Sequence, residues 1–276
     1  MIACLLPTPE GPLIVPERQA LPCPGGLSPE AQGQGEQAVL FSLVVPTYNE
    51  RENIAPLVKQ LTCALDSAVP GNYELIIVDD DSPDGTYRQV EETARTYPQL
   101  RLIRRLNERG LSTAVVRGWQ GARGDIIGVI DGDLQHPPSV LLALLEKVQQ
   151  GADVAIASRY LQEGGLGSWG AVRRFLSRGA QALGWLILPE VIGKTSDPMS
   201  GFFLLRRSVI AGRKLDPAGY KILVEVLGRG QARQIAEVPF VFQLRQHGQT
   251  KVTWRQYIEY VRHLLKLRFF LWKAGS

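Results

Sequence analysis

Short apolar runs that alternate with helical segments constrain the fold of this chain more than any other feature. Each run is bounded by turn residues and is typical of a strand buried on both faces. Because strands and helices alternate through five strands, we expect a parallel sheet with right-handed crossovers. The expected strands cover residues 39–45, 73–78, 100–103, 126–130 and 152–157.

Two carboxylates directly follow the fourth of these expected strands. Asp131 and Asp133 would lie at the carboxyl end of a parallel strand, where open α/β sheets bind their ligands. Because one residue separates them, both can reach one hard cation or its bound phosphates, and Gln135 adds a third oxygen. Gly132 between them lets the backbone come close to a ligand. The alternative is an acidic turn that only ends the strand.

Polar residues also follow the first two expected strands. After the first, Asn49 with Glu52 can cap the next helix, and Glu50 can accept hydrogen bonds from a sugar or a base. After the second, four carboxylates lie close together, which is costly unless cations or hydrogen-bond donors answer them. An Asp there can receive a ribose hydroxyl or a base N–H. The alternatives are a helix-cap turn and a solvated acidic turn. The four carboxylates are Asp79, Asp80, Asp81 and Asp84.

The composition narrows the classes of function. The formal net charge of +4 suits an anionic ligand or an anionic membrane surface, and without an RNA-binding pattern we expect no nucleic-acid partner. The three cysteines lack metal-ligand spacing, which indicates a reducing compartment without a disulfide framework. No apolar run approaches the roughly 18 residues that span a bilayer. We interpret His136, His247 and His263 as loop and surface residues.

Three further segments carry weaker patterns. Residues 1–38 are rich in Pro, Gly and Gln, and we expect a disordered or loosely packed leader. Residues 169–192 are unusually apolar, as expected either for core or for an interfacial helix on a membrane. Residues 253–276 combine apolar and basic side chains at helical spacing, which predicts a basic amphipathic helix suited to a headgroup layer. Alternatively, that helix packs on the domain or on a separate membrane subunit.

Seven motifs occur in order along the chain: VVPTYNE at 44–50, VDDDSPDGT at 78–86, DGDLQHPP at 131–138, SRY at 158–160, DPMSGFF at 197–203, GYKIL at 219–223 and RQHGQTK at 245–251. Together they give the chain a family resemblance. It resembles the family 2 glycosyltransferases, and within them the dolichol-phosphate or polyprenol-phosphate mannosyltransferases, over about residues 40 to 268. Gly132 stands where Ala is usual, and Thr250 where Ser is usual.

The resemblance implies a fold and a reaction. The fold is GT-A, a Rossmann-like α/β domain over residues 39–252 whose mostly parallel central sheet is flanked by helices. The reaction is inverting transfer of a hexose, most simply mannose from GDP-mannose, to the phosphate of a dolichyl or polyprenyl monophosphate. Mg²⁺ or Mn²⁺ would bridge the donor diphosphate and neutralise charge as it leaves. The acceptor phosphate is already anionic, so no strong general base is required.

The resemblance also implies roles for individual residues. The metal would be held by Asp131, Asp133 and Gln135. The nucleotide sugar would contact Pro46, Tyr48, Glu50, Val78, Asp80, Asp131, Gly132, Asp133, Lys221, Arg245 and Lys251. The catalytic set would be Asp131, Asp133, Arg245 and Lys251, and the acceptor phosphate would be gripped by Arg159, Arg173 and Ser177. Without the motif match, Lys221 is a solvated helix-start lysine, and Arg245 and Lys251 belong to a basic loop.

Rival functions remain open at this point. UDP-glucose or another donor would keep the mechanism, because the nucleoside motif does not decide the base. A family 2 transferase with a non-lipid acceptor is a second rival, and a non-catalytic nucleotide-sugar-binding module is a third. The expected partners are the nucleotide sugar, the lipid phosphate, and a membrane surface or a separate membrane subunit. We therefore expect a peripheral enzyme at the cytoplasmic face of a membrane.

Overall fold

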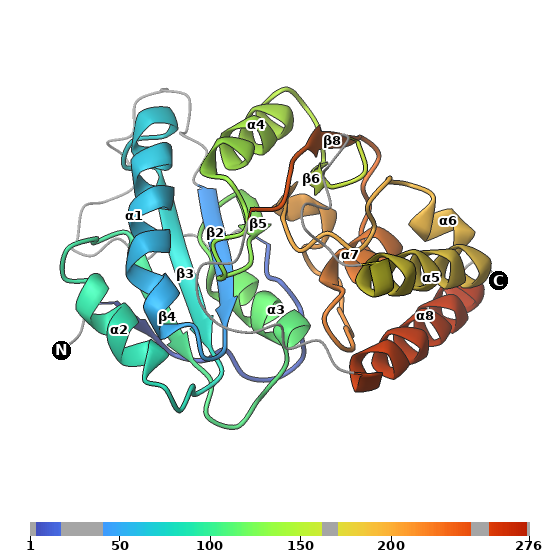
Figure 1. The fold of residues 1–276 in the computed structure, drawn as a ribbon, viewed down its shortest axis with the longest axis horizontal. Helices are drawn as coiled ribbons and strands as arrows, with labels where there is room; N and C mark the ends of the chain where they lie inside the picture. Colours follow the sequence, from blue (N-terminus) through green and yellow to red (C-terminus); the bar gives the residue numbers. More distant parts are fainter. Residues whose placement is uncertain (1–3, 18–40, 162–170, 244–253, 275–276) are drawn as a thin grey trace.

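The computed structural model describes residues 4–17, 41–161, 171–243 and 254–274, which form one mixed α/β sheet covered by helices (Figure 1). The strands are β1 Leu5–Leu6, β2 Phe41–Thr47, β3 Tyr73–Asp79, β4 Leu100–Arg104, β5 Ile126–Val129, β6 Val154–Ser158, β7 Phe203–Arg206 and β8 Ile235–Pro239. The helices are α1 Arg51–Ala68, α2 Thr86–Thr93, α3 Leu111–Gly121, α4 Pro138–Gln149, α5 Ala171–Ile187, α6 Pro189–Ile192, α7 Ile222–Arg229 and α8 Trp254–Ala274, with a 3₁₀ turn at Arg207–Val209.

The sheet is mostly parallel, as predicted. Its strand order among the described residues is β1-β4-β3-β2-β5-β7-β6-β8. Only β7 runs antiparallel, between β5 and β6. Because β7 enters the sheet from the edge where β5 and β6 end, the segment before it crosses the carboxyl ends of both strands.

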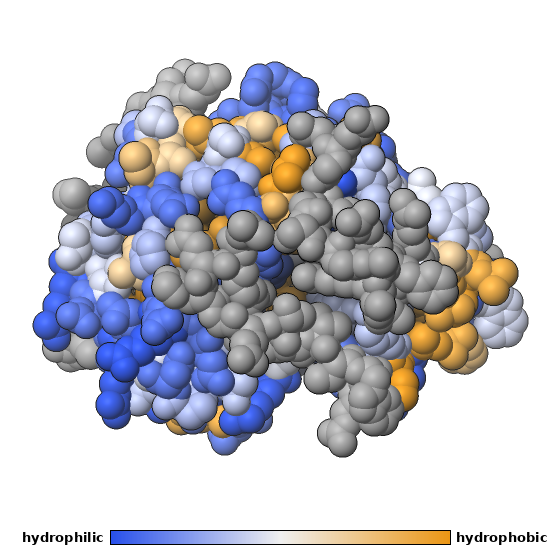
Figure 2. All heavy atoms as spheres, in the orientation of Figure 1, coloured by the Kyte–Doolittle hydropathy of each residue, from blue (hydrophilic) through white to orange (hydrophobic). Residues whose placement is uncertain are grey.

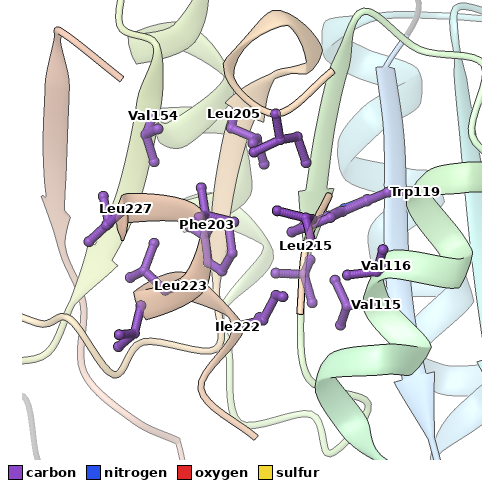
Figure 3. Close-up of a cluster of buried hydrophobic side chains, with 14 of the residues drawn as sticks. Val115, Val116, Trp119, Val154, Phe203, Leu205, Leu215, Ile222, Leu223 and Leu227 are labelled. Atoms are coloured by element: carbon purple, nitrogen blue, oxygen red, sulfur yellow. The ribbon is translucent and has the colours of Figure 1, made fainter. Parts of the chain in front are cut away.

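Each face of the sheet has its own apolar core because successive residues of a strand point to opposite faces. On β2, Leu43 and Val45 pack in the core beneath α1 and α4, whereas Val44 packs in the core beneath α3. In the second core, Phe203 of β7 meets the ring of Trp119 edge-on at 6.1 Å (Figure 3). The indole Nε1 of Trp119 donates to the carbonyl of Gly128, 3.1 Å away.

Residues 4–17 correct the expectation of a disordered or loosely packed leader. β1 adds to the sheet as a parallel strand beside β4, and Val15 is fully buried. Residues 4–17 are held by partners that are distant in the sequence, and a prediction from local composition misses such partners. Arg117 donates to the carbonyl of Gly11, and Gln120 donates to that of Ile14. Residues 18–38 of the expected leader lie outside the described residues.

The start of α1 also differs from the predicted cap. Glu50, not Asn49, occupies the N-cap position, and no side-chain cap hydrogen bond forms there. Asn49 adopts a positive φ of 54°. The helix therefore begins one residue later than the capping pattern predicts.

Candidate active site

Eight of the eleven predicted donor-binding residues follow or end strands β2, β3 and β5 at their carboxyl ends, namely Pro46, Tyr48, Glu50, Val78, Asp80, Asp131, Gly132 and Asp133. Pro46 and Val78 are direct partners across β2 and β3. On the other side of β2, Val44 pairs with Val129 of β5, and the N–H of Ile130 donates to the carbonyl of Val44. After β2 the chain builds outward through β3 and β4, then returns to place β5 on the opposite side of β2. This reversal is the topological switch point where open α/β sheets bind ligands.

The two aspartates that follow β5 lie in different environments. Asp133 is buried at 8% exposure, and its Oδ1 accepts the backbone N–H of Gln135 at 3.2 Å. The Asp131 side chain is 32% exposed, and its Oδ2 lies 3.5 Å from Nε2 of His136. A Cβ placed on Gly201 would be 2.7 Å from the same Oδ2. Glycine at position 201 therefore leaves the room that the Asp131 carboxylate occupies.

Gln135 is tied to the segment after β8. Its side-chain amide donates to the carbonyl of Gln243 at 2.9 Å, and the N–H of Gln243 donates back to the carbonyl of Gln135 at 3.0 Å. Within the described ranges no group of three or more His, Cys, Asp or Glu side chains could hold a metal ion. Mg²⁺ commonly binds through one or two carboxylates while substrate phosphates and water complete its shell. The carboxylates of Asp131 and Asp133 are of the kind that fits such an ion, and the role of Gln135 as a further ligand stays a prediction.

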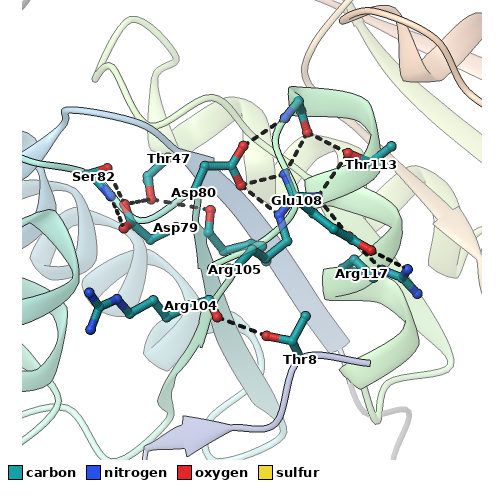
Figure 4. A network of polar contacts seen from close by, with 12 residues as sticks. Thr8, Thr47, Asp79, Asp80, Ser82, Arg104, Arg105, Glu108, Thr113 and Arg117 are labelled. Carbon is teal, nitrogen blue, oxygen red and sulfur yellow. Dashed lines mark hydrogen bonds and ion pairs between the residues drawn. The ribbon is translucent and has the colours of Figure 1, made fainter. Parts of the chain in front are cut away.

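The carboxylates of the acidic turn after β3 form hydrogen bonds and ion pairs within the protein (Figure 4). Asp79 accepts hydrogen bonds from the N–H and hydroxyl of Ser82 and from the hydroxyl of Thr47. Burial raises the pKa of Asp79, and these hydrogen bonds oppose the rise. All four carboxylates of the turn therefore have partners, although Asp81 is also partly exposed to solvent. Asp81 pairs with Arg104, and Asp84 accepts from Thr86 and from the backbone of Arg51.

Asp80 is held by the loop that precedes α3. The buried guanidinium of Arg105 contacts Oδ1 through Nε at 2.7 Å, and the N–H of Gly110 donates to Oδ2 at 2.8 Å. Arg105 also donates to the hydroxyl of Thr113, and Glu108 bridges Arg105 and Arg117. Burial raises the pKa of Asp80, and Arg105 opposes that rise. Asp80 thus fixes the 105–110 loop beside the predicted nucleoside site.

Tyr48 and Glu50 lie at the end of β2 as predicted. The guanidinium carbon of Arg109 is 5.5 Å from the centre of the Tyr48 ring, which brings the 105–110 loop over that tyrosine. Glu50 is 9% exposed, and its carboxylate accepts from the amide of Asn53 at 2.6 Å. The backbone N–H of Glu50 donates to the hydroxyl of Thr86, which joins the turn after β2 to the start of α2.

Residues 195–202, which precede β7, connect several predicted site residues. Asp197 receives both Nε and Nη2 of Arg159, and the pair is buried. Burial alone would lower the pKa of Arg159, but Asp197 more than compensates and holds it above its ordinary value. The ammonium of Lys221 donates to the carbonyl of Met199 at 3.1 Å. Lys221 does lie at a helix start, as the N-cap residue of α7, but it is partly buried and hydrogen-bonded rather than fully solvated.

Sequence reasoning missed three contributors to this site. Asp197 and Gly201 belong to the DPMSGFF motif, which was recognised without a role for either residue. His136 lies in a loop, as predicted, but His136 is 4% exposed and His263, on helix α8, is 1% exposed, so the prediction that they are surface residues was wrong. His263 of α8 pairs with the buried carboxylate of Glu225 on α7 at 2.7 Å. The sequence signal for His136 and Gly201 was their place inside the motifs DGDLQHPP and DPMSGFF.

Four predicted site residues cannot be placed in detail. Arg245 and Lys251 lie outside the described residues, as does His247. Positions 173 and 177 fall on α5 one helical turn apart, and the described part of the structure does not include their side chains. Their roles stay predictions.

α5 and α8 form one end of the molecule, where hydrophobic residues reach the surface (Figure 2). Within residues 179–192, Leu188 and Ile192 are buried in the core, whereas Trp185 and Leu186 are exposed. On α8, Leu264 and Leu267 are buried. The exposed apolar side chains of the two helices are Trp185, Leu186, Ile258, Leu265, Phe269, Phe270 and Trp272. In the parts of the chain described, no helix is long and apolar enough to cross a membrane.

Comparison with known proteins identifies the family. Residues 42–212 match the family described as Glycosyl transferase family 2. The chain belongs to glycosyltransferase family 2. It is 44% identical to the dolichol-phosphate mannosyltransferase of Pyrococcus furiosus over 227 residues, which cover 82% of this chain and 63% of that protein. This family 2 chain is also 34% identical to the dolichol-phosphate mannosyltransferase of Saccharomyces cerevisiae, covering 87% of this chain and 91% of that protein.

Solved structures agree with the fold of this family 2 chain. Glucosyl-3-phosphoglycerate synthase from Mycobacterium tuberculosis, solved with Mn²⁺ and UDP-glucose, superposes with a TM-score of 0.64 at 19% identity, covering 84% of this chain and 80% of that one. Mannosyl-3-phosphoglycerate synthase from Rubrobacter xylanophilus gives 0.63 at 23% identity, covering 86% and 75%. The predicted family and the mostly parallel GT-A fold are confirmed.

Proposed function

We propose that this protein transfers mannose from GDP-mannose to the phosphate of a dolichyl or polyprenyl monophosphate, with inversion at the anomeric carbon. One observation carries the proposal: an aspartate pair lies at the switch point of a chain 34–44% identical to proteins named dolichol-phosphate mannosyltransferases. The chain spans 63% of the length of the archaeal relative, so the activity of that whole protein enters here as a proposal.

The donor site takes its parts from three strand ends. Pro46 and Val78, neighbours across the sheet, form the floor beside the nucleoside, and Tyr48, Glu50 and Asp80 border it. Asp131, Asp133 and Gln135 would hold the Mg²⁺ or Mn²⁺ that accompanies the donor, with Gly132 allowing close approach. When bound, the metal neutralises charge that develops on the departing diphosphate. Lys221, Arg245 and Lys251 supply further positive charge for the same purpose.

The reaction is a displacement at the sugar. An oxygen of the acceptor phosphate attacks the anomeric carbon from the side opposite the nucleoside diphosphate. The new carbon–oxygen bond forms as the bond to the diphosphate breaks, and the electron pair leaves with the diphosphate. A phosphate monoester with a second pKa of about 6 is largely dianionic at neutral pH, so no residue has to remove a proton from it. The protein contributes positioning and charge stabilisation.

The acceptor approaches from the side of α5 and α8. Arg173 and Ser177, one turn apart on α5, are proposed to grip the lipid phosphate, because arginine matches phosphate geometry. Arg159 is already paired with Asp197, so its proposed contribution is to orient that edge as well as to attract the phosphate. The exposed aromatic residues of α8 alternate with Lys266, Arg268 and Lys273, a combination suited to a lipid headgroup layer. We therefore propose peripheral attachment at the cytoplasmic face of a membrane.

A transfer assay tests the function. Purified protein, Mn²⁺ or Mg²⁺ and a short polyprenyl phosphate are incubated with radiolabelled GDP-mannose or UDP-glucose, and the label in the lipid phase is measured. Asp133→Asn serves as the inactive control. Label from GDP-mannose alone supports the proposal. Label from UDP-glucose alone contradicts the donor but keeps the reaction, and no lipid label while the donor binds contradicts the lipid acceptor.

A further inference from the structure

His136 lies next to the candidate metal site and has no role in the mechanism above. Its side chain is 2% exposed, and its Nε2 lies 3.5 Å from Oδ2 of Asp131. Neither ring nitrogen has a hydrogen-bond partner among the described residues. Buried polar groups in folded proteins almost always have partners, so two unsatisfied nitrogens beside an active-site carboxylate require an explanation.

Aromatic rings fix the orientation of this imidazole. Phe202, Phe240 and Phe242 surround it, with ring centres 5.1, 5.2 and 5.1 Å from that of His136. These side chains come from two separate segments, one leading into β7 and one following β8. Because aromatic faces accept no strong hydrogen bond, the cage offers the nitrogens nothing to bind. The polar group that faces the imidazole is the Asp131 carboxylate.

Gly201 also lies close to the Asp131 carboxylate. A Cβ on Gly201 would approach Oδ2 to 2.7 Å, so this oxygen is near both His136 and the backbone at position 201. A movement of about 0.5 Å would bring Nε2 and Oδ2 to hydrogen-bond distance. Such contacts often tighten only when the ligands of a site are bound.

We propose that His136 is a positioning residue that orients the Asp131 carboxylate toward the divalent cation by donating a hydrogen bond from Nε2 to Oδ2. The inference rests on the metal site of the proposed function. Residues that hydrogen-bond to metal ligands fix the ligand orientation, and their loss typically lowers metal affinity 10- to 100-fold. Through Gln135 and Gln243, the same arrangement joins the metal site to the chain segment that leads toward Arg245.

The test compares metal affinity with stability in the full chain. Mn²⁺ binding is measured by electron paramagnetic resonance with and without GDP, and thermal unfolding is followed by circular dichroism. His136→Phe keeps an aromatic ring in the cage but removes both nitrogens, whereas His136→Gln restores an N–H donor. His263→Gln is the matched control, because it replaces a buried histidine that lies on α8 and pairs with Glu225.

The expected pattern separates positioning from packing. His136→Phe should weaken Mn²⁺ binding by about 10- to 100-fold while leaving the melting temperature unchanged or higher, because two unsatisfied buried nitrogens are removed. His136→Gln should recover part of the affinity, and His263→Gln should lower the melting temperature without changing Mn²⁺ binding. Wild-type affinity in His136→Phe would overturn the inference alone. Failure of the wild-type chain to bind Mn²⁺ would overturn the metal site of the proposed function together with the inference.

Discussion

Gly201 and Asp131 are in contact across two strand ends: a Cβ at position 201 would lie 2.7 Å from Oδ2 of the aspartate and 3.1 Å from its Cγ. Residue 201 precedes β7, which runs antiparallel beside β5, and Asp131 follows β5. Contacts under 3.0 Å do not occur for real Cβ atoms, so any side chain at position 201 must displace the carboxylate.

Gly201→Ala should therefore damage catalysis more than stability. A displacement of about 1 Å in a site of this kind can cost about 10²-fold in rate, and we expect a loss of that order in mannose transfer. Steady-state kinetics and Mn²⁺ titration provide the measurement. Gly179→Ala is the matched control, because a Cβ there meets no atom within 4 Å on helix α5. Equal activity of the two variants would contradict the tight contact.

Asp133→Asn should abolish measurable transfer, with a loss of at least about 10²-fold, because the cation loses a charged ligand. Its fold should persist, since asparagine can still accept the N–H of Gln135 that Asp133 accepts now. Transfer assays and circular dichroism check both statements. The exposed Glu146→Gln on α4 controls for the loss of one carboxylate charge. Normal turnover in Asp133→Asn would remove Asp133 from the metal site.

Glu74 gives a prediction for pH dependence. Burial would raise its pKa, but Arg101, Ser42 and the backbone of Arg123 together hold it below the ordinary value of 4.5. Since the folded pKa is the lower one, the ionised carboxylate stabilises the fold above pH 4.5, and this contribution is lost as pH falls through the lowered pKa. Glu74→Gln should cost about 3 kcal/mol at pH 7, the scale of breaking a buried pair.

Urea unfolding at several pH values tests this prediction. The difference between wild type and Glu74→Gln should be largest near neutral pH and should shrink in acid, below the ordinary pKa of the carboxyl. Replacing the exposed Glu146 by glutamine should cause no such difference at any of these pH values. A constant difference across the pH range would show that packing, not ionisation, explains the loss.

The surface of α8 gives a prediction for membrane attachment. Phe269 and Trp272 are 55% and 65% exposed. Replacing both by serine should weaken binding to vesicles of phosphatidylcholine and phosphatidylserine by about tenfold or more, because each ring loses part of about 1.5–3 kcal/mol of burial. Cosedimentation measures the change. Leu106→Ser, at a residue 65% exposed near the opposite end of the sheet, is the control. Unchanged vesicle binding in the double variant would favour a protein partner for this surface.

Individual residues show how much of the candidate site could be predicted from the sequence. The position of Asp131 followed from one rule, because ligands bind at the carboxyl ends of parallel strands, whereas Pro46 and Val78 were implied by the family resemblance. Asp80 was expected to face a nucleoside, and the structure adds that Arg105 and Gly110 hold it. Those partners lie 25 and 30 residues away, in a loop whose sequence carries no periodic signal. Residues 4–17 were misjudged for the same reason, since their partners are distant.

The sequence by itself determined the strand and helix alternation, the acidic strand ends and the family, because these depend on local periodicity and on motifs. Only the tertiary structure decided that β7 enters antiparallel between β5 and β6. That insertion carries residues 195–202 across the strand ends and brings Gly201 to Asp131 and Asp197 to Arg159. It also places Phe202 against His136. The direction of a four-residue strand depends on which neighbours bury its two faces, and no pattern within four residues encodes that choice.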